Sequence, residues 1–212
     1  MPSAKDEILG KIRKALSVGN DAPVAPDLTS PIYAPLPDED LVVAFAHMFK
    51  EKGGELIYAS SEEELSEGIS GFLYAYQYRQ VYVWDTIAAD FLADQNCQVI
   101  TNDKNLEDIE VAFTICEMMV ARTGSIVVSS AKASGRRLSI YPPHHVVIAA
   151  ASQIVADIDD AFKALKRLYP EQLPSMVSMI TGPSRTADIE KTLVLGAHGP
   201  KRLTLFLLDD IE

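Results

Sequence analysis

The chain has 212 residues, of which 48% are hydrophobic and 23% are charged, a balance typical of a globular protein with one large core. Its net charge of -11 argues against a nucleic-acid partner, because such binding needs a basic face, and it disfavours an anionic membrane surface. No apolar run reaches the roughly 18 residues of a membrane span, and the first residues lack the apolar core of a secretory signal. We therefore expect a cytoplasmic protein that contacts neither nucleic acid nor membrane.

The charge is distributed unevenly along the chain. Residues 1–110 carry 8 Lys and Arg against 20 Asp and Glu, whereas residues 111–212 carry 11 against 10. An anion meets less electrostatic repulsion near the second half, so we expect anion binding there.

The sequence contains two cysteines, Cys97 and Cys116, which are well separated. Neither has another Cys or a His at the spacing of zinc or iron–sulfur ligands. We expect two reduced structural thiols, and neither a metal site nor a bound cofactor.

The N-terminal region precedes the globular part. Apolar residues recur at helical spacing from Ser3 to Leu16, which predicts an amphipathic helix. Residues 19–37 hold five prolines, a density typical of an extended linker. The predicted organisation is an N-terminal helix over residues 1–18, a Pro-rich linker over 19–37 and one α/β domain over 38–212.

After the linker, helical and strand patterns alternate. Ser61 followed by Glu64 forms a capping box at the start of one helix. Repeated strand–helix units predict an open, mostly parallel sheet with flanking helices. The expected helices cover residues 38–50, 61–76, 87–93, 158–169 and 187–195, and the expected strands cover 56–59, 81–84, 98–100, 125–129, 146–150, 177–180 and 203–208.

The loop before the last predicted helix is a candidate anion site. Backbone N–H groups at a helix N-terminus are unpaired and carry the positive end of the dipole, so Ser184, Arg185 and Thr186 would suit a carboxylate or phosphate there. Arg185 adds a guanidinium fork that binds such groups bidentately. The alternative is that Ser184 or Thr186 merely caps the helix and Asp188 complements its dipole.

His198 stands in a tight loop between Gly196 and Gly199, where a histidine has little packing to do. Its imidazole could donate to an anion or move a proton near neutral pH. The alternative is a turn histidine that bonds to local backbone. Spacing alone assembles no Ser-His-Asp or Cys-His set.

Two further segments are candidates. Thr123, Gly124 and Ser125 open a strand, and the glycine would let backbone approach a ligand closely, although a plain strand-entry turn explains the same residues. In the YPPHH turn, one of His144 and His145 is expected to face inward.

Together these segments resemble a known family. The runs TGS at 123–125, PPHHV at 142–146, GPSRTADIE at 182–190 and GAHGP at 196–200 are similar to the LUD domain of the lactate-utilisation protein C family. The resemblance implies a fold like that of the NagB, ribose-5-phosphate isomerase and CoA-transferase group, an open α/β sheet with its ligand cleft at the carboxyl ends of the strands.

The resemblance also implies a function. Family members act with two iron–sulfur partner proteins in the oxidation of L-lactate to pyruvate, so this chain would bind a small anionic organic ligand while its partners carry the clusters. Alternatives are a free-standing transferase or isomerase acting on a phosphorylated or CoA-linked substrate, and a non-catalytic assembly subunit. Arg122 departs from the acidic residue expected before the Thr-Gly pair. The implied pocket positions are Thr123, Gly124, Ser125, His145, Gly182, Ser184, Arg185, Thr186, Asp188, His198 and Gly199, with His198, Asp188 and His145 as catalytic candidates.

Overall fold

A computed structural model describes residues 4–17, 36, 40–104, 106–186, 194–196 and 198–211. The chain divides into two units, Met1–Pro35 and Leu36–Glu212. Most of the predicted linker over 19–37 lies outside the described residues, so the domain boundaries remain predictions.

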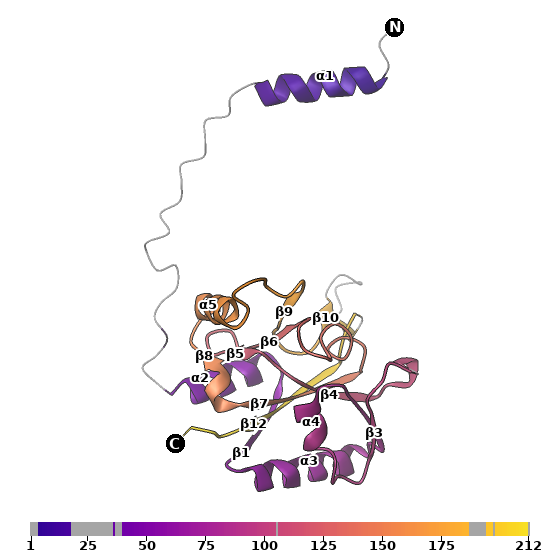
Figure 1. Cartoon of the computed structure of the whole chain (residues 1–212), viewed down its shortest axis with the longest axis vertical. Helices are drawn as coiled ribbons and strands as arrows, with labels where there is room; N and C mark the ends of the chain where they lie inside the picture. Colours follow the sequence, from indigo (N-terminus) through magenta and orange to yellow (C-terminus); the bar gives the residue numbers. More distant parts are fainter. Residues whose placement is uncertain are drawn as a thin grey trace. The chain divides into compact units, whose positions relative to one another are not determined.

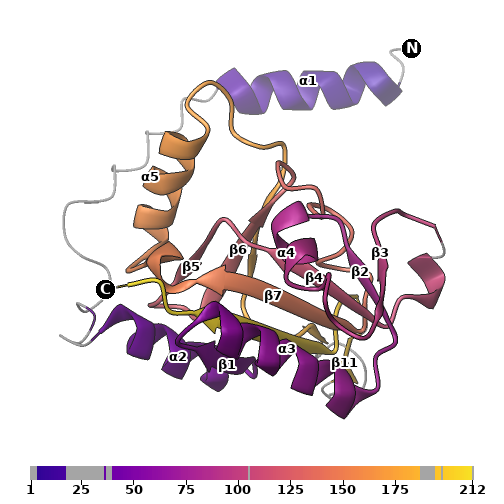
Figure 2. The ribbon, with the colours of Figure 1, turned by 60° about the horizontal axis from the view of Figure 1, so that its bottom comes forward.

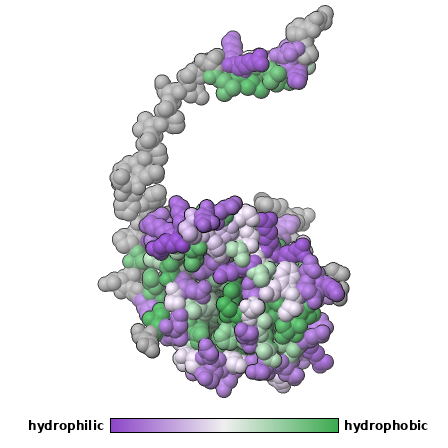
Figure 3. All heavy atoms as spheres, viewed as in Figure 1, coloured by the Kyte–Doolittle hydropathy of each residue, from purple (hydrophilic) through white to green (hydrophobic). Residues whose placement is uncertain are grey.

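The described part of the first unit is the helix α1 (Ala4–Ser17). Asp6 and Glu7 lie in its first turn and Lys14 in its last, an order that complements the helix dipole. Ile8 and Ile12 are among its exposed apolar residues, and Figure 3 shows the apolar side chains gathered along one side of the helix. The amphipathic helix predicted from the sequence is therefore present.

The centre of the second unit is a six-stranded sheet in which every pair of neighbours is parallel (Figure 1). Its middle strands are almost entirely buried, as expected for a parallel sheet covered on both faces. The predicted α/β fold class is confirmed. In spatial order the strands are β1 (Glu55–Ala59), β12 (Arg202–Leu208), β7 (His144–Ala150), β4 (Val111–Ile115), β2 (Gln80–Val83) and β3 (Gln98–Ile100).

The helices α3 (Glu62–Tyr76) and α4 (Thr86–Asp90) cover one face of this sheet (Figures 1 and 2). The Ser61 hydroxyl accepts from the Glu64 N–H at 3.2 Å, as the capping box predicts. The Glu64 carboxylate accepts from the N–H of Ser60, at 2.8 Å, instead of that of Ser61. The predicted helix start is therefore confirmed, with the reciprocal bond displaced by one residue.

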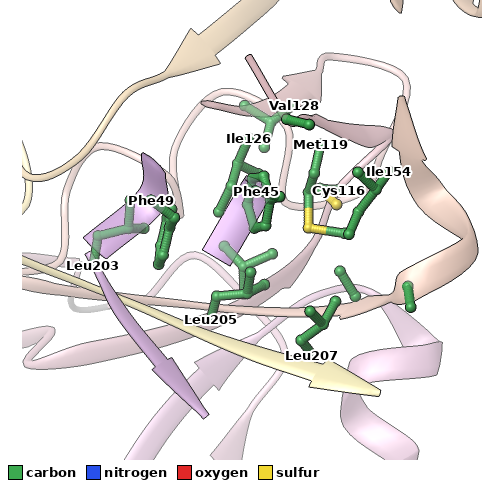
Figure 4. Packing of buried hydrophobic residues seen from close by; sticks show 14 of the residues in the cluster. Phe45, Phe49, Cys116, Met119, Ile126, Val128, Ile154, Leu203, Leu205 and Leu207 are labelled. Atoms are coloured by element: carbon green, nitrogen blue, oxygen red, sulfur yellow. The ribbon is translucent and has the colours of Figure 1, made fainter. Parts of the chain in front are cut away.

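The helix α2 (Leu41–Glu51) packs on the opposite face. Its N-cap Asp40 accepts from the Val42 N–H at 2.7 Å. Phe45 and Phe49 are fully buried against side chains of β12 such as Leu205 (Figure 4). This cluster is the core of the domain on this face of the sheet.

A second, four-stranded sheet shares that face and was not predicted. Its strands, in order, are β8 (Ile154–Val155), β5 (Met118–Val120), β6 (Ser125–Ser129) and β9 (Val177–Ile180), with β5, β6 and β9 antiparallel. The helix α5 (Ile158–Leu168) covers its outer face, where Ala161 and Leu165 contact the buried Met118. Every residue of β6 is buried, and an unbroken apolar run of this kind does not tell to which sheet a strand belongs.

The predicted helix over 187–195 is wrong at its described end. Val194 and Leu195 form β11 (Val194–Leu195), which pairs antiparallel with β10 (Arg185–Thr186); residues 187–193 lie outside the described residues.

The sequence pattern also missed β4 and β5. Short 3₁₀ turns occur at Leu106–Asp108 and Ala151–Gln153. Within the described part of the chain, no helix is long and apolar enough to span a bilayer.

Candidate functional site

The loops named by the motifs meet at the amino edge of the six-stranded sheet. Pro143 directly precedes β7, and its carbonyl accepts from the N–H groups of Lys201 and Arg202, at 2.8 and 3.1 Å, where β12 begins. The expectation that the cleft lies at the carboxyl ends of these strands is wrong for these loops. The reason is connectivity: residues 198–200 lead directly into β12 and therefore lie at its amino end.

The two predicted ligand loops lie side by side. The Ser184 N–H donates to the Pro200 carbonyl at 2.8 Å, and the Ser184 carbonyl accepts from the Gly196 N–H at 2.9 Å. Gly199 packs so closely on Ser184 that an added Cβ would lie 3.2 Å from the serine Cβ. The backbone thus fixes the distance between the Ser184 and His198 loops.

A cavity of about 390 Å³ opens beside the second loop. It combines an imidazole with the ammonium group of an exposed lysine, Lys201, and such a pair favours an anion. The motifs did not point to Lys201, although it immediately follows the Gly-Pro step, and Tyr141, which begins the YPPHH turn, was not a candidate residue. The lining residues are Ile140, Tyr141, Pro143, Gly196, His198, Gly199 and Lys201.

The Arg185 side chain lies at the same edge of the sheet but forms its hydrogen bond with α2. Its Nη2 donates to the carbonyl of Lys52, the C-cap of α2, at 2.6 Å, where a cation also complements the helix dipole. Arg185 is not among the described residues that line the cavity. Arg185 and Thr186 belong to β10, and the residues at which the predicted helix would begin lie outside the described part of the chain.

Two glycines of the motifs are required by the close approach of α2. Gly124 has φ +60°, and an added Cβ would lie 2.5 Å from the Phe49 backbone nitrogen. Gly182 has φ +81°, and its Cβ would lie 2.2 Å from the Lys52 carbonyl oxygen. Both positions exclude a side chain through backbone contact, so these glycines have a structural reason within the fold.

The hydroxyls of Thr123 and Ser125 belong to one hydrogen-bond network. The Ser125 Oγ donates to the Thr123 Oγ1 at 2.7 Å and lies 2.8 Å from the Thr181 Oγ1, which joins the start of β6 to the end of β9. Beside them, the Arg122 Nε donates to Asp157, the N-cap of α5, at 2.5 Å. The unexpected arginine therefore anchors a helix start.

Both histidines of the YPPHH turn are buried, whereas one was expected to face inward. They point to opposite faces of β7, and both faces are covered. His145 lies 2.9 Å from the Thr114 hydroxyl through Nε2, and burial lowers its pKa to about 3, assisted by His144. His145 is thus neutral near pH 7. The third catalytic candidate, Asp188, lies outside the described residues.

Both cysteines are free thiols, and burial raises the pKa of Cys116 to about 12. Among the described residues, no three His, Cys, Asp or Glu side chains gather where they could hold a metal ion.

Comparison with known proteins agrees with this architecture. Lactate utilization protein C of Bacillus licheniformis is 29% identical over 163 residues, and that of Anoxybacillus flavithermus is 30% identical over 158 residues. Each alignment covers 74% of this chain and 64% of the relative, so the chain spans less than two thirds of these relatives. A crystal structure of a DUF162 family protein from Deinococcus radiodurans has the same fold, with a TM-score of 0.60 at 22% identity, over 79% of this chain and 96% of that chain.

The family model for the LUD domain matches residues 43–208, which include the six-stranded sheet, the four-stranded sheet and both motif loops. Because this match takes in most of the chain, the chain belongs to the LUD domain family.

Proposed function

We propose that this chain is a component of lactate utilisation that binds a small organic anion at the amino edge of its parallel sheet. In this proposal it acts with iron–sulfur partner proteins in the oxidation of L-lactate to pyruvate. The names of the curated relatives, lactate utilization protein C, support the metabolic role. The cavity lined by His198 and Lys201 is the observation from which we infer that the ligand is an anion.

The cavity suits a carboxylate for electrostatic reasons. Lys201 supplies a point charge, and His198 supplies a ring nitrogen that can donate a hydrogen bond. Backbone bonds between the Ser184 and His198 loops hold the backbone that carries these two side chains, which reduces the loop entropy lost on binding.

In the proposal, this chain and its partners carry out different parts of the reaction. Conversion of lactate to pyruvate releases two electrons and two protons, and in the proposal the iron–sulfur partners accept the electrons. The contribution of this chain is to bind and orient the anion. The proposed ligand-binding set is Thr123, Gly124, Ser125, Gly182, Ser184, Arg185, Thr186, His198 and Gly199, to which the geometry adds Lys201.

Calorimetric titration tests the site. We expect His198→Ala and Lys201→Met each to weaken binding of the anion about tenfold or more, the loss of a hydrogen bond to a charged group. Lys166→Met, on the exposed face of α5, serves as the control. The ligands are L-lactate, pyruvate, phosphate and a CoA ester, and unchanged affinities in both variants would contradict the site.

Reconstitution tests the partnership. We expect L-lactate-dependent reduction of an artificial electron acceptor only when the chain is combined with the iron–sulfur proteins of a lactate-oxidising complex. Turnover of a CoA thioester by the chain alone would instead favour the transferase alternative.

A further inference from the structure

A second cavity, of about 680 Å³, lies at the amino edge of the six-stranded sheet where β2 and β3 begin. Its size falls within the range of small-molecule sites, roughly 300–1,000 Å³. The last turn of α3 and the segments that lead into β2 and β3 form its walls, and none of the family motifs includes them. Among the described residues, it shares no lining residue with the cavity of the proposed function. Its lining includes Tyr74, Gln77, Tyr78, Arg79, Gln95 and Asn96.

The lining of this cavity carries a cation and no carboxylate. Residues 1–110 hold 20 Asp and Glu against 8 Lys and Arg, yet none of the described residues that line the cavity is acidic. Arg79 is exposed, and its side chain forms no ion pair with a described residue. Asp108 and Glu110 line a smaller cavity that shares Gln77 and Arg79 with the first. The guanidinium can therefore pair with one anionic group, while the acids beyond it oppose further negative charge.

Two tyrosine rings line the same cavity. Tyr74 is 87% exposed, the highest value among the large apolar side chains of the described residues. Tyr78 is fixed, because its hydroxyl lies 3.0 Å from the His144 Nδ1 and its ring stacks on that of Tyr76 with the centroids 5.5 Å apart. An exposed ring beside a guanidinium suits a ligand that is both planar and anionic, because stacking removes the ring from water.

Gln77 joins α3 to β2 in an unfavourable backbone conformation. Among the described residues, it alone combines a side chain with a positive φ, 56°. Its N–H donates to the Tyr74 carbonyl at 3.2 Å, and the Tyr78 N–H donates to the Leu73 carbonyl at 3.0 Å. Glycine is the favoured residue at such a helix end. The amide side chain therefore opposes folding at this position, and it lines both cavities.

Gln95 presents an oxygen of known orientation. Its Nε2 donates to the Ser66 hydroxyl at 3.0 Å and to the Ser66 carbonyl at 3.3 Å. Because a carbonyl oxygen only accepts, these bonds determine which end of the amide is the nitrogen, and Oε1 is left to accept from a ligand. The amino group of adenine is a matching donor, whereas the carbonyl oxygen of hypoxanthine at the same ring position would face another acceptor.

We propose that this cavity binds an adenine nucleoside monophosphate. The phosphate pairs with Arg79, the base stacks on Tyr74, and the amino group of the base donates to Gln95 Oε1. The Gln77 amide forms a further hydrogen bond with the nucleotide. One guanidinium matches one phosphate group, and a nucleotide of this kind is the ligand that uses the cation, the exposed ring and the oriented amide together.

Calorimetry with four ligands, in the absence of divalent cations, tests the ligand class. We expect adenosine monophosphate (AMP) to bind about tenfold or more tightly than adenosine, because the phosphate bonds to a charged group. We expect a similar preference for AMP over inosine monophosphate, and weaker binding of ATP. Absence of AMP binding, or binding of any of the other three ligands as tight as that of AMP, would overturn the inference.

Variants test the residues. Arg79→Met should lower the affinity for AMP to that for adenosine. Tyr74→Ala should weaken binding of both ligands about tenfold, the loss of one stacked base. Gln77→Gly should raise the melting temperature by about 1–3 °C, since it removes the left-handed strain, and should still weaken AMP binding. A purely structural role would not produce these opposite effects. Arg167→Met and Phe162→Ala, exposed on α5, are the matched controls.

The remaining outcomes separate this site from the cavity of the proposed function. Full AMP affinity in both Arg79→Met and Tyr74→Ala, or equal losses in the two control variants, would overturn the inference. Loss of AMP binding in His198→Ala but not in Arg79→Met would place the nucleotide in the other cavity and also overturn it. Loss in Arg79→Met with full affinity in His198→Ala supports it, whether or not His198→Ala binds lactate. Thermal denaturation verifies that each variant is folded.

Discussion

The two edges of the six-stranded sheet hold their polar groups in different ways. At the amino edge, backbone hydrogen bonds and close-packed glycines fix the Ser184 and His198 loops, and the side chains of His198 and Lys201 remain exposed. At the carboxyl edge, the buried carboxylates of Asp85 and Glu117 fix the chain through side-chain bonds. The motif-rich edge is thus built mainly by backbone geometry, and the edge without motifs by hydrogen bonds to buried carboxylates.

The largest expected effect tests the backbone geometry of the amino edge. Gly182→Ala should lower the free energy of unfolding by about 3 kcal/mol or more, since its Cβ would meet the Lys52 carbonyl oxygen in a left-handed conformation. Gly71→Ala in α3, where an added Cβ has open space, should instead raise it by up to about 1 kcal/mol. Urea denaturation measures both, and equal effects would refute the close-approach explanation.

The matching test at the carboxyl edge removes a buried charge. Glu117→Ala should lower the free energy of unfolding by about 2–3 kcal/mol, because the Ser129 and Tyr169 hydroxyls and Lys132 lose their acceptor. Glu117→Gln should cost less, since its amide can still bond to both hydroxyls. A loss as large in Gln as in Ala would show that charge, and not hydrogen bonding, stabilises this edge.

The pH dependence of stability probes the buried histidines that begin β7. Burial lowers the pKa of His144 from 6.5 to about 4, so the unfolded chain binds more protons between these values. Its contribution to stability is complete above about pH 6.5 and declines as the pH falls towards 4, by up to about 1.4 kcal/mol per pH unit.

Substitution of His144 should make this decline shallower. We expect His144→Gln to lose less stability than the wild-type chain between about pH 7 and about pH 5, measured by urea denaturation at both values. His145, whose pKa is lowered to about 3, should supply the slope that remains. Parallel curves for the variant and the wild-type chain would contradict the assignment.

The smallest effect concerns Arg185. Because this exposed side chain donates a hydrogen bond to the Lys52 carbonyl, Arg185→Ala should lower the free energy of unfolding by about 1 kcal/mol. Its effect on anion affinity should be smaller than that of His198→Ala, since it is not among the described residues lining the cavity. A larger loss of affinity in Arg185→Ala would place the anion nearer to α2.

Local signals in the sequence determined much of the second unit. Ser61 with Glu64 marked the start of α3 because a cap depends on residues three positions apart. Apolar runs marked β7 and β12 because strands bury consecutive residues in a covered sheet. The order of the Thr-Gly-Ser, Gly-Pro-Ser-Arg and His-Gly-Pro segments indicated the family, whose model matches residues 43–208.

Tertiary structure alone decided where those segments lie. The motifs predicted that the Ser184 and His198 loops belong together, but not that they meet at the amino edge, because that depends on which strands pair across the sheet. Nor did local spacing connect Arg185 to Lys52 or Glu117 to Lys132. The first pair is separated by 133 residues, and the second meets only after β5 and β6 have formed a hairpin. Such contacts follow from how the chain packs, and periodicity and caps report only on residues within a turn or a strand of one another.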